Sequence, residues 1–199
     1  MCIISLNIRG LGTTPKYLAL KNLLLSLHPL IILIQEMMHN VPHAIEYFRK
    51  MFPTWHITAI AAMGLSGSLV ALWDPRWINM KDFKCFVGIL LEGNIHGMLG
   101  YVHILNIYAP YRERGEFWDI FISPSIMELQ TLIIAGDLNC IISLDETWGC
   151  FRKTDPLAGK IQNATIMNNF VDIHLYKISP TWDNGRSSSA MWKKDWIDS

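Results

Sequence analysis

The feature that most constrains the fold of this chain is an apolar run that ends in a glycine and two polar side chains, Leu132-Ile133-Ile134-Ala135-Gly136-Asp137-Leu138-Asn139. An apolar run of this length, bounded by glycine, is typical of a fully buried strand. Such a strand would bring a carboxylate and a carboxamide to one edge of a sheet. The alternative is an ordinary β-turn capped by Asp137 and Asn139, so the choice depends on how other strands end.

Other predicted strands also end in polar side chains. The segment Cys2 to Asn7 ends in an amide, and the buried run Leu30 to Gln35 is followed at once by Glu36. A third segment, Gly97 to Tyr108, ends in a phenol. The repetition favours a sheet edge lined with polar groups over a set of unrelated turns.

The remaining elements alternate between helical and extended patterns. Helices are expected from Pro15 to Leu27, from Pro42 to Met51, from Glu113 to Glu128 with a kink or split at Pro124, and from Lys160 to Phe170. Strands are expected at Trp55 to Ala61, Ser68 to Trp73, Ile78 to Val87 and Ala190 to Ile197. Because antiparallel hairpins lie between helical segments, the order favours an α/β class with a mixed-sheet sandwich.

Composition limits the classes of protein. A chain of 199 residues suits one domain, residues 1–199, and 51% hydrophobic with 17% charged residues indicates a globular protein. The formal net charge is zero. This balance counts against tight non-specific DNA binding, although a local basic patch would escape the test.

Cysteine spacing and hydropathy bear on localisation. The four cysteines form no C-x-x-C pair, which argues against a zinc ribbon and a disulfide framework, so we expect an intracellular protein with no disulfide partner. No basic region precedes the first apolar residues, so no signal peptide is expected. The run Leu23 to Ile34 is broken by His28-Pro29 and is shorter than the ~20 residues of a membrane span, so no membrane segment is expected.

Five polar residues at or near these strand ends suit phosphoryl chemistry: Asn7, Glu36, Tyr108, Asp137 and Asn139. Mg²⁺ prefers hard oxygen ligands and is commonly held by one or two carboxylates plus substrate phosphate. Glu36 fits that role, and Asp137 fits the group that positions or deprotonates the attacking water. Asn7 and Asn139 can hold these groups without adding charge, and Tyr108 can donate to a phosphate oxygen. Individually, each has a structural alternative: a turn-forming amide, a solvated strand end or a core ring.

At this point four motifs carry a family resemblance. In chain order they are Leu6-Asn7-Ile8-Arg9-Gly10, Ile34-Gln35-Glu36, Asn106-Ile107-Tyr108-Ala109-Pro110 and Gly136-Asp137-Leu138-Asn139. This set resembles the endonuclease/exonuclease/phosphatase family, which includes apurinic endonucleases, deoxyribonuclease I and inositol-polyphosphate phosphatases. The resemblance extends over nearly the whole chain and implies a DNase I-like α/β sandwich.

A narrower resemblance is carried by Gly64 to Trp73 and by Pro180 to Arg186. Both segments are similar to the endonuclease region of plant non-LTR (LINE-type) retrotransposons. That resemblance implies Mg²⁺-dependent nicking of DNA, with Mn²⁺ as an alternative metal, and a parent polyprotein that carries a reverse transcriptase. It also implies nuclear action if the substrate is genomic DNA.

The resemblance assigns a role to each matching residue. Glu36 is the metal ligand, Asp137 and Asn139 handle the nucleophile, Tyr108 contacts the phosphate and Asn7 supports the metal site. Arg9 and Arg186 are candidates for substrate contact. Arg9 also stands where some relatives have a metal-binding Asp and others an Arg.

The end of the sequence departs from the family pattern. Relatives usually finish with an Arg-Ile-Asp-like strand and a terminal Ser-Asp-His. Here either Asp195 or Asp198 fits the metal-binding aspartate of that strand, and no histidine follows His174. We therefore expect a fold that lacks its last strand, a domain incomplete at its C-terminus, and weak or absent activity.

Two alternatives remain open from the sequence. One is a non-catalytic retrotransposon remnant or binding module. The other is a phosphatase or nuclease of the same fold that acts on a substrate other than DNA.

Overall fold

A computed structural model describes residues 1–10, 13–37, 40–61, 68–112, 114–149 and 152–173, with two short strands, Trp182–Asp183 (β10) and Trp192–Lys194 (β11). The expected site residues Arg186, Asp195 and Asp198 lie outside these ranges, as does most of the loop before Ser68. Their predicted roles therefore stay predictions.

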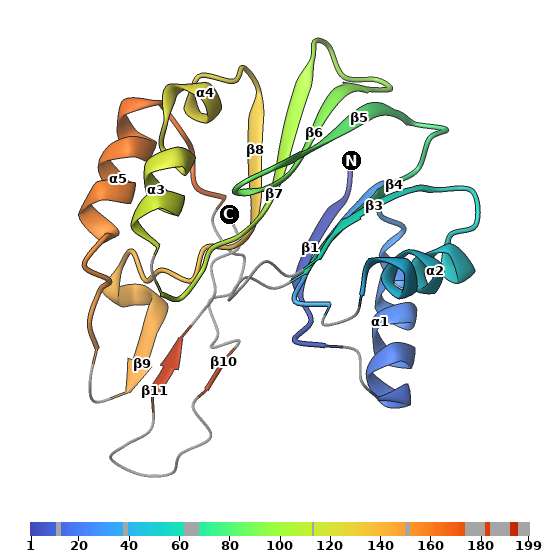
Figure 1. Ribbon diagram of the computed structural model, residues 1–199, viewed down its shortest axis with the longest axis horizontal. Coiled ribbons are helices and arrows are strands. Elements are labelled where there is room, and N and C mark those ends of the chain that lie inside the picture. Colours follow the sequence, from blue (N-terminus) through green and yellow to red (C-terminus); the bar gives the residue numbers. More distant parts are fainter. Residues whose placement is uncertain are drawn as a thin grey trace.

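Two four-stranded sheets form a sandwich, and helices cover its two outer faces (Figure 1). The strand order in one sheet is β1 (Ile3–Asn7), β2 (Ile31–Gln35), β4 (Leu69–Trp73) and β3 (His56–Ile60). In the other sheet it is β5 (Ile78–Cys85), β6 (Gly88–Ile95), β7 (Val102–Tyr108) and β8 (Leu132–Asp137). One apolar cluster, which includes Leu33 and Ile104, lies between the sheets. A second cluster packs the first sheet against α1 and α2, and a third packs the second sheet against α3, α4 and α5. The expected mixed-sheet α/β sandwich is confirmed.

The first sheet consists of β1 (Ile3–Asn7), β2 (Ile31–Gln35), β4 (Leu69–Trp73) and β3 (His56–Ile60). β1 and β2 run parallel and are connected through α1 (Thr14–Leu27), while β4 is antiparallel to both β2 and β3. α2 (Val41–Met51) follows β2, and the side chain of Asn40 caps its N-terminus. All five residues of β2 are buried because sheet and helices cover both of its faces.

The second sheet contains β5 (Ile78–Cys85), β6 (Gly88–Ile95), β7 (Val102–Tyr108) and β8 (Leu132–Asp137). Only the β7–β8 pair is parallel. Outside it lie α3 (Gly115–Phe121), α4 (Pro124–Met127) and α5 (Ala158–Met167), so the helix expected at 113–128 is split at Pro124. A short 3₁₀ turn, Leu144–Glu146, and β9 (Thr147–Gly149) precede α5, and β9 pairs with β11.

The start predicted for one strand was wrong, and a strand for which no prediction was made precedes it. We expected a strand from Gly97 to Tyr108, whereas β7 begins at Val102 and a separate strand, β6, occupies 88–95. Gly97 and Gly100 have φ values of +85° and +92°, which place them in the turn between the two strands. Inside β6, a Cβ on Gly93 would lie 2.1 Å from the carbonyl oxygen of Asn79, so this strand needs its glycine.

The topology brings four strand ends to one edge of the sandwich. Asn7 pairs with Gln35 at the ends of β1 and β2, and Tyr108 pairs with Asp137 at the ends of β7 and β8. A buried hydrogen bond from Gln35 Nε2 to Asn106 Oδ1, 2.7 Å long, joins the two sheets beside this edge. The polar ends of both sheets are therefore held in a fixed relation.

In the parts of the chain that the structure describes, no helix is both long and apolar enough to cross a bilayer.

Candidate active site at the shared sheet edge

The side chain of Asn7 joins two carboxylates that come from different sheets. Its amide nitrogen donates to Glu36 Oε1 at 2.9 Å and to Asp137 Oδ2 at 2.7 Å. Asn7 and Asp137 are 130 positions apart in the sequence. Since one nitrogen contacts both oxygens, the two carboxylates lie no farther apart than these two hydrogen bonds laid end to end.

The carboxylates of Glu36 and Asp137 are largely removed from water. The exposed fraction is 8% for Glu36 and 1% for Asp137. Tyr108 donates its hydroxyl proton to Glu36 Oε1 at 2.7 Å, and burial together with this contact raises the pKa of the Tyr108 phenol. Buried charge is costly unless it is compensated, so this edge favours the arrival of positive charge.

Several backbone positions around the site adopt conformations that non-glycine residues rarely occupy. Arg9, Glu36 and Asn139 have φ values of 45°, 53° and 48°. Each left-handed residue costs about 1–2 kcal/mol, and such strain gathers where geometry serves a function. The Glu36 conformation is held in part by its carbonyl oxygen, which accepts a 2.7 Å hydrogen bond from the amide of Gly10.

Asn139 is fixed by three hydrogen bonds. Its backbone amide donates to Asp137 Oδ1 at 2.9 Å, and its side-chain nitrogen donates to the carbonyl of Ala109 at 2.6 Å. Its own carbonyl accepts from Arg114 Nη1 at 3.0 Å. The remaining polar atom, Oδ1, is buried and has no hydrogen-bond partner among the described residues. This oxygen can accept a hydrogen bond from a group outside the described residues, such as a water molecule.

A phenol that the sequence interpretation missed lies at this edge. Tyr111 is half exposed. Its partial burial, and to a smaller extent the charge of Asp137, raise the pKa of its phenol to about 12. The charges of Arg9 and Glu36 also act on it, in opposite directions. No periodic pattern marks Tyr111; its only signal in the sequence is its place directly after Ala109-Pro110.

No protein-family profile and no curated protein matches the chain. Among solved structures, the endonuclease domain of TRAS1, a telomere-specific non-LTR retrotransposon, matches 96% of this chain and 83% of its own at 13% identity, with a TM-score of 0.61. The chain has the DNase I-like fold. An AP endonuclease, LMAP from Leishmania major, matches 85% of this chain and 67% of its own at 14% identity, with a TM-score of 0.64.

A third match confirms the extent of the DNase I-like fold. TDP2 from D. rerio, complexed with a single-strand DNA product, covers 98% of this chain and 80% of its own at 14% identity, with a TM-score of 0.58. Identities this low establish the fold alone. The expected fold of the endonuclease/exonuclease/phosphatase type is thus confirmed, while the roles of individual residues stay predictions.

The DNase I-like chain brings the expected residues Asn7, Glu36, Tyr108, Asp137 and Asn139 together. In this structure the Tyr108 hydroxyl donates to the Glu36 carboxylate. To contact a phosphate as expected, it would have to turn this hydrogen bond from Glu36 to a phosphate oxygen or share it between the two. The sixth expected residue of the described chain, Arg9, donates its backbone amide to the side-chain oxygen of Asn7 at 3.1 Å.

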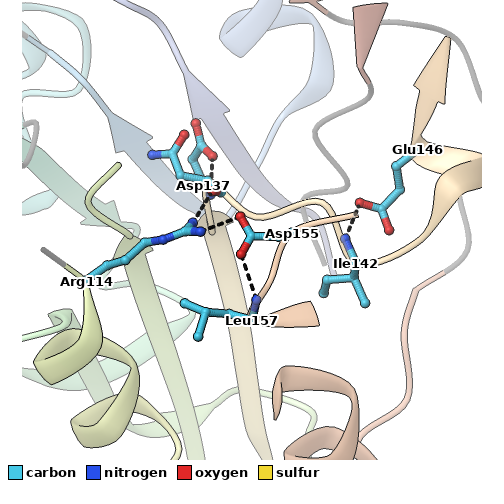
Figure 2. Close-up of polar contacts among 7 residues, drawn as sticks. Arg114, Asp137, Ile142, Glu146, Asp155 and Leu157 are labelled. Carbon is cyan, nitrogen blue, oxygen red and sulfur yellow. Dashed lines mark hydrogen bonds and ion pairs between the residues drawn. The ribbon is translucent and has the colours of Figure 1, made fainter. Parts of the chain in front are cut away.

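An ion pair between Arg114 and Asp155 also supports this site of the DNase I-like fold (Figure 2). The sequence interpretation missed both residues, because neither ends a strand nor belongs to a periodic pattern. Arg114 comes just before α3, and Asp155 lies in the loop before α5. Asp155 Oδ1 also accepts from the amide of Leu157 at 2.9 Å, which fixes the entry into α5.

The donor set fits a hard divalent cation. Across the described ranges no three His, Cys, Asp or Glu side chains form a metal-binding group. Glu36 and Asp137 provide two carboxylates, and Mg²⁺ commonly uses one or two carboxylates while it keeps several waters. Asn139 Oδ1, which has no hydrogen-bond partner among the described residues, can accept a hydrogen bond from a metal-bound or attacking water.

Proposed function

We propose that the chain is a metal-dependent phosphodiester hydrolase of retrotransposon origin that nicks DNA. The observation that carries the proposal is the Asn7 amide, which holds the Glu36 and Asp137 carboxylates together at 2.9 and 2.7 Å. Glu36 and Asp137 are two buried carboxylates from opposite sheets, and Asn139 adds a carboxamide oxygen without a hydrogen-bond partner among the described residues. This arrangement suits a cation and an activated water.

The chain's own groups divide the chemistry between them. Asp137 accepts a proton from the attacking water as the new P–O bond forms and the P–O bond to the leaving sugar oxygen breaks, and that oxygen then takes a proton from solvent. Asn139 Oδ1 accepts a hydrogen bond that fixes the direction of the attacking water. Asn7 and Tyr108 hold Glu36 in place through their hydrogen bonds. Mg²⁺ or Mn²⁺ held by Glu36 would supply charge stabilisation for the phosphate and the leaving oxygen.

The choice of DNA as substrate draws on the structural neighbours. TRAS1 contributes an endonuclease domain from a non-LTR retrotransposon, LMAP is an AP endonuclease, and TDP2 was solved with a single-strand DNA product. These likenesses support DNA as substrate, and the TRAS1 match supports a retrotransposon origin. A parent polyprotein with a reverse transcriptase rests on the sequence resemblance. A plant LINE origin and nuclear action rest on the sequence resemblance.

The test is nicking of supercoiled plasmid by the purified chain, in Mg²⁺ or Mn²⁺ and in EDTA. We expect slow, cation-dependent conversion of supercoiled to relaxed circles. The variants Glu36→Gln and Asp137→Asn keep the side-chain shape and remove the charge, and we expect each to lower the rate by a factor on the order of 10²–10³. Glu92→Gln, which changes a carboxylate on β6, serves as the matched control and should cleave at the rate of the unchanged chain.

The outcomes separate the alternatives. Cation-dependent nicking that survives both site variants would show that the activity does not belong to this site. A folded protein that cleaves bis-(p-nitrophenyl) phosphate or p-nitrophenyl phosphate but not plasmid would move the substrate away from DNA. A folded protein that binds plasmid and cleaves none of the three would identify a binding module and overturn the proposal.

A further inference from the structure

Arg114 is in direct contact with the backbone of Asn139. Arg114 Nη1 donates to the Asn139 carbonyl at 3.0 Å, while its other terminal nitrogen pairs with the Asp155 carboxylate. Both side chains are largely buried, with exposed fractions of 17% and 14%. The guanidinium is therefore held by two partners, the Asp155 carboxylate and the Asn139 carbonyl. Together they fix its orientation beside the active-site loop.

Asp155 is itself anchored at the start of α5. Its backbone amide donates to the carbonyl of Ile141 at 2.8 Å, and its carbonyl accepts from the amide of Ala158 at 3.0 Å. Its side chain also accepts from the amide of Leu157 at 2.9 Å. Figure 2 shows Asp155 between Arg114 and Leu157, so the ion pair connects the loop after β8 to α5.

These contacts determine where the free oxygen of Asn139 lies. Asn139 adopts a φ of 48°, a left-handed conformation that asparagine tolerates better than most residues with a side chain. Its two nitrogens and its carbonyl oxygen all take part in hydrogen bonds, and its side chain also interacts with Tyr108, so the position of Oδ1 follows from where these contacts hold the residue. Of these contacts, the bond from Arg114 is the only one that connects the site to α5 through a charged side chain.

We propose that Arg114, anchored by Asp155, is a positioning residue that aims the side-chain oxygen of Asn139 at the attacking water. The proposal rests on the proposed function. Arg114 contacts neither substrate nor metal in this assignment; it acts through Asn139. Its removal should therefore slow the chemical step while substrate binding is preserved.

The test is a double-mutant cycle on the full chain, with the plasmid and bis-(p-nitrophenyl) phosphate as substrates. Arg114→Ala should lower kcat by a factor on the order of 10², as expected for a displaced catalytic group, and leave KM within about twofold. In an Asn139→Ala background the same change should have little further effect, because its target is gone. Arg114→Lys, which can still pair with Asp155, should recover part of the lost rate.

Lys160→Ala provides a matched control. Lys160 and Asp119 form an ion pair between α5 and α3, the same two helices, without contact to Asn139. If Arg114 merely fastens these helices together, the two alanine variants should reduce kcat alike. Additive losses for Arg114→Ala and Asn139→Ala, or equal losses for Arg114→Ala and Lys160→Ala, would overturn the proposal.

A second readout does not need catalysis. Hydrogen exchange measured by mass spectrometry on peptides covering 136–143 should be faster in Arg114→Ala and unchanged in Lys160→Ala. Unchanged exchange in Arg114→Ala would contradict the positioning role even if the unchanged chain cleaves nothing. Absence of cleavage by the unchanged chain, with faster exchange in Arg114→Ala, would instead count against the proposed function alone.

Discussion

Replacement of Asn7 by aspartate tests the electrostatics of the site most sharply. Asn7→Asp keeps the shape of the side chain but replaces the donor that joins Glu36 and Asp137 with a third acceptor. Hydrogen bonds to charged groups contribute about 1.5–3 kcal/mol each. Since Asn7 is half-buried, the low end applies, and loss of both bonds should cost about 3 kcal/mol of unfolding free energy.

Repulsion between carboxylates adds to this cost. Two unit charges about 4 Å apart interact by about 4 kcal/mol at an effective dielectric constant of 20. Protonation or separation of the groups will relieve part of it, so a loss of at least about 3 kcal/mol near pH 7 in EDTA is the expected result. A divalent cation should reverse much of this loss, because the variant places more negative charge around it.

Urea denaturation in EDTA and in Mg²⁺ or Mn²⁺ measures both effects. A cation at 100 times its dissociation constant stabilises the folded state by about 2.7 kcal/mol, and the increment should be larger in Asn7→Asp than in the unchanged chain. Asn163→Asp, the same chemical change on the exposed side of α5, controls for the added charge. If Asn7→Asp is as stable as the unchanged chain in EDTA, or gains no more stability from the cation than the unchanged chain does, the assignment of this edge as a cation site is refuted.

Two further predictions concern stability. Gly136→Ala should cost about 3 kcal/mol in urea denaturation, because Gly136 has a φ of +140° and an added Cβ would lie 2.0 Å from the carbonyl oxygen of Ile107; a loss near zero would contradict the close approach of β7 and β8. Arg76 holds the pKa of the Asp74 carboxyl below its usual value, so the stability this pair provides should be complete above about pH 4, the ordinary pKa of an aspartate, and vanish as the pH falls through the lowered pKa. Urea midpoints of Asp74→Asn and the unchanged chain should therefore converge in acid, and a difference that persists at the lowest pH would contradict this assignment.

The strands that form the site could be predicted because each has a one-dimensional signature. β1, β2 and β8 are short apolar runs that end in polar residues, and the structure places them within a residue or two of the expected bounds. β6 could not be found in this way. Its Glu92-Gly93-Asn94 segment has low strand propensity, and it is a strand because it pairs on both sides with β5 and β7, which no local pattern shows.

The same distinction separates the site residues that were predicted from those that were missed. Glu36, Asp137 and Asn139 follow buried runs, so their position along the chain shows that they reach the sheet edge. Arg114 and Asp155 reach the site from irregular segments around α3 and α5. Their contact spans 41 positions and depends on how the helices pack against the sheet, which no local pattern encodes.

The most direct test of the central claim is anomalous scattering from crystals of the chain grown or soaked with Mn²⁺. Bound Mn²⁺ should give a peak at the shared sheet edge, about 2.0–2.3 Å from a carboxylate oxygen of Glu36 and beside Asp137. The peak should vanish in Glu36→Gln. A peak at another place, or none at an Mn²⁺ concentration that supports nicking, would contradict the claim that these residues form the metal-dependent site.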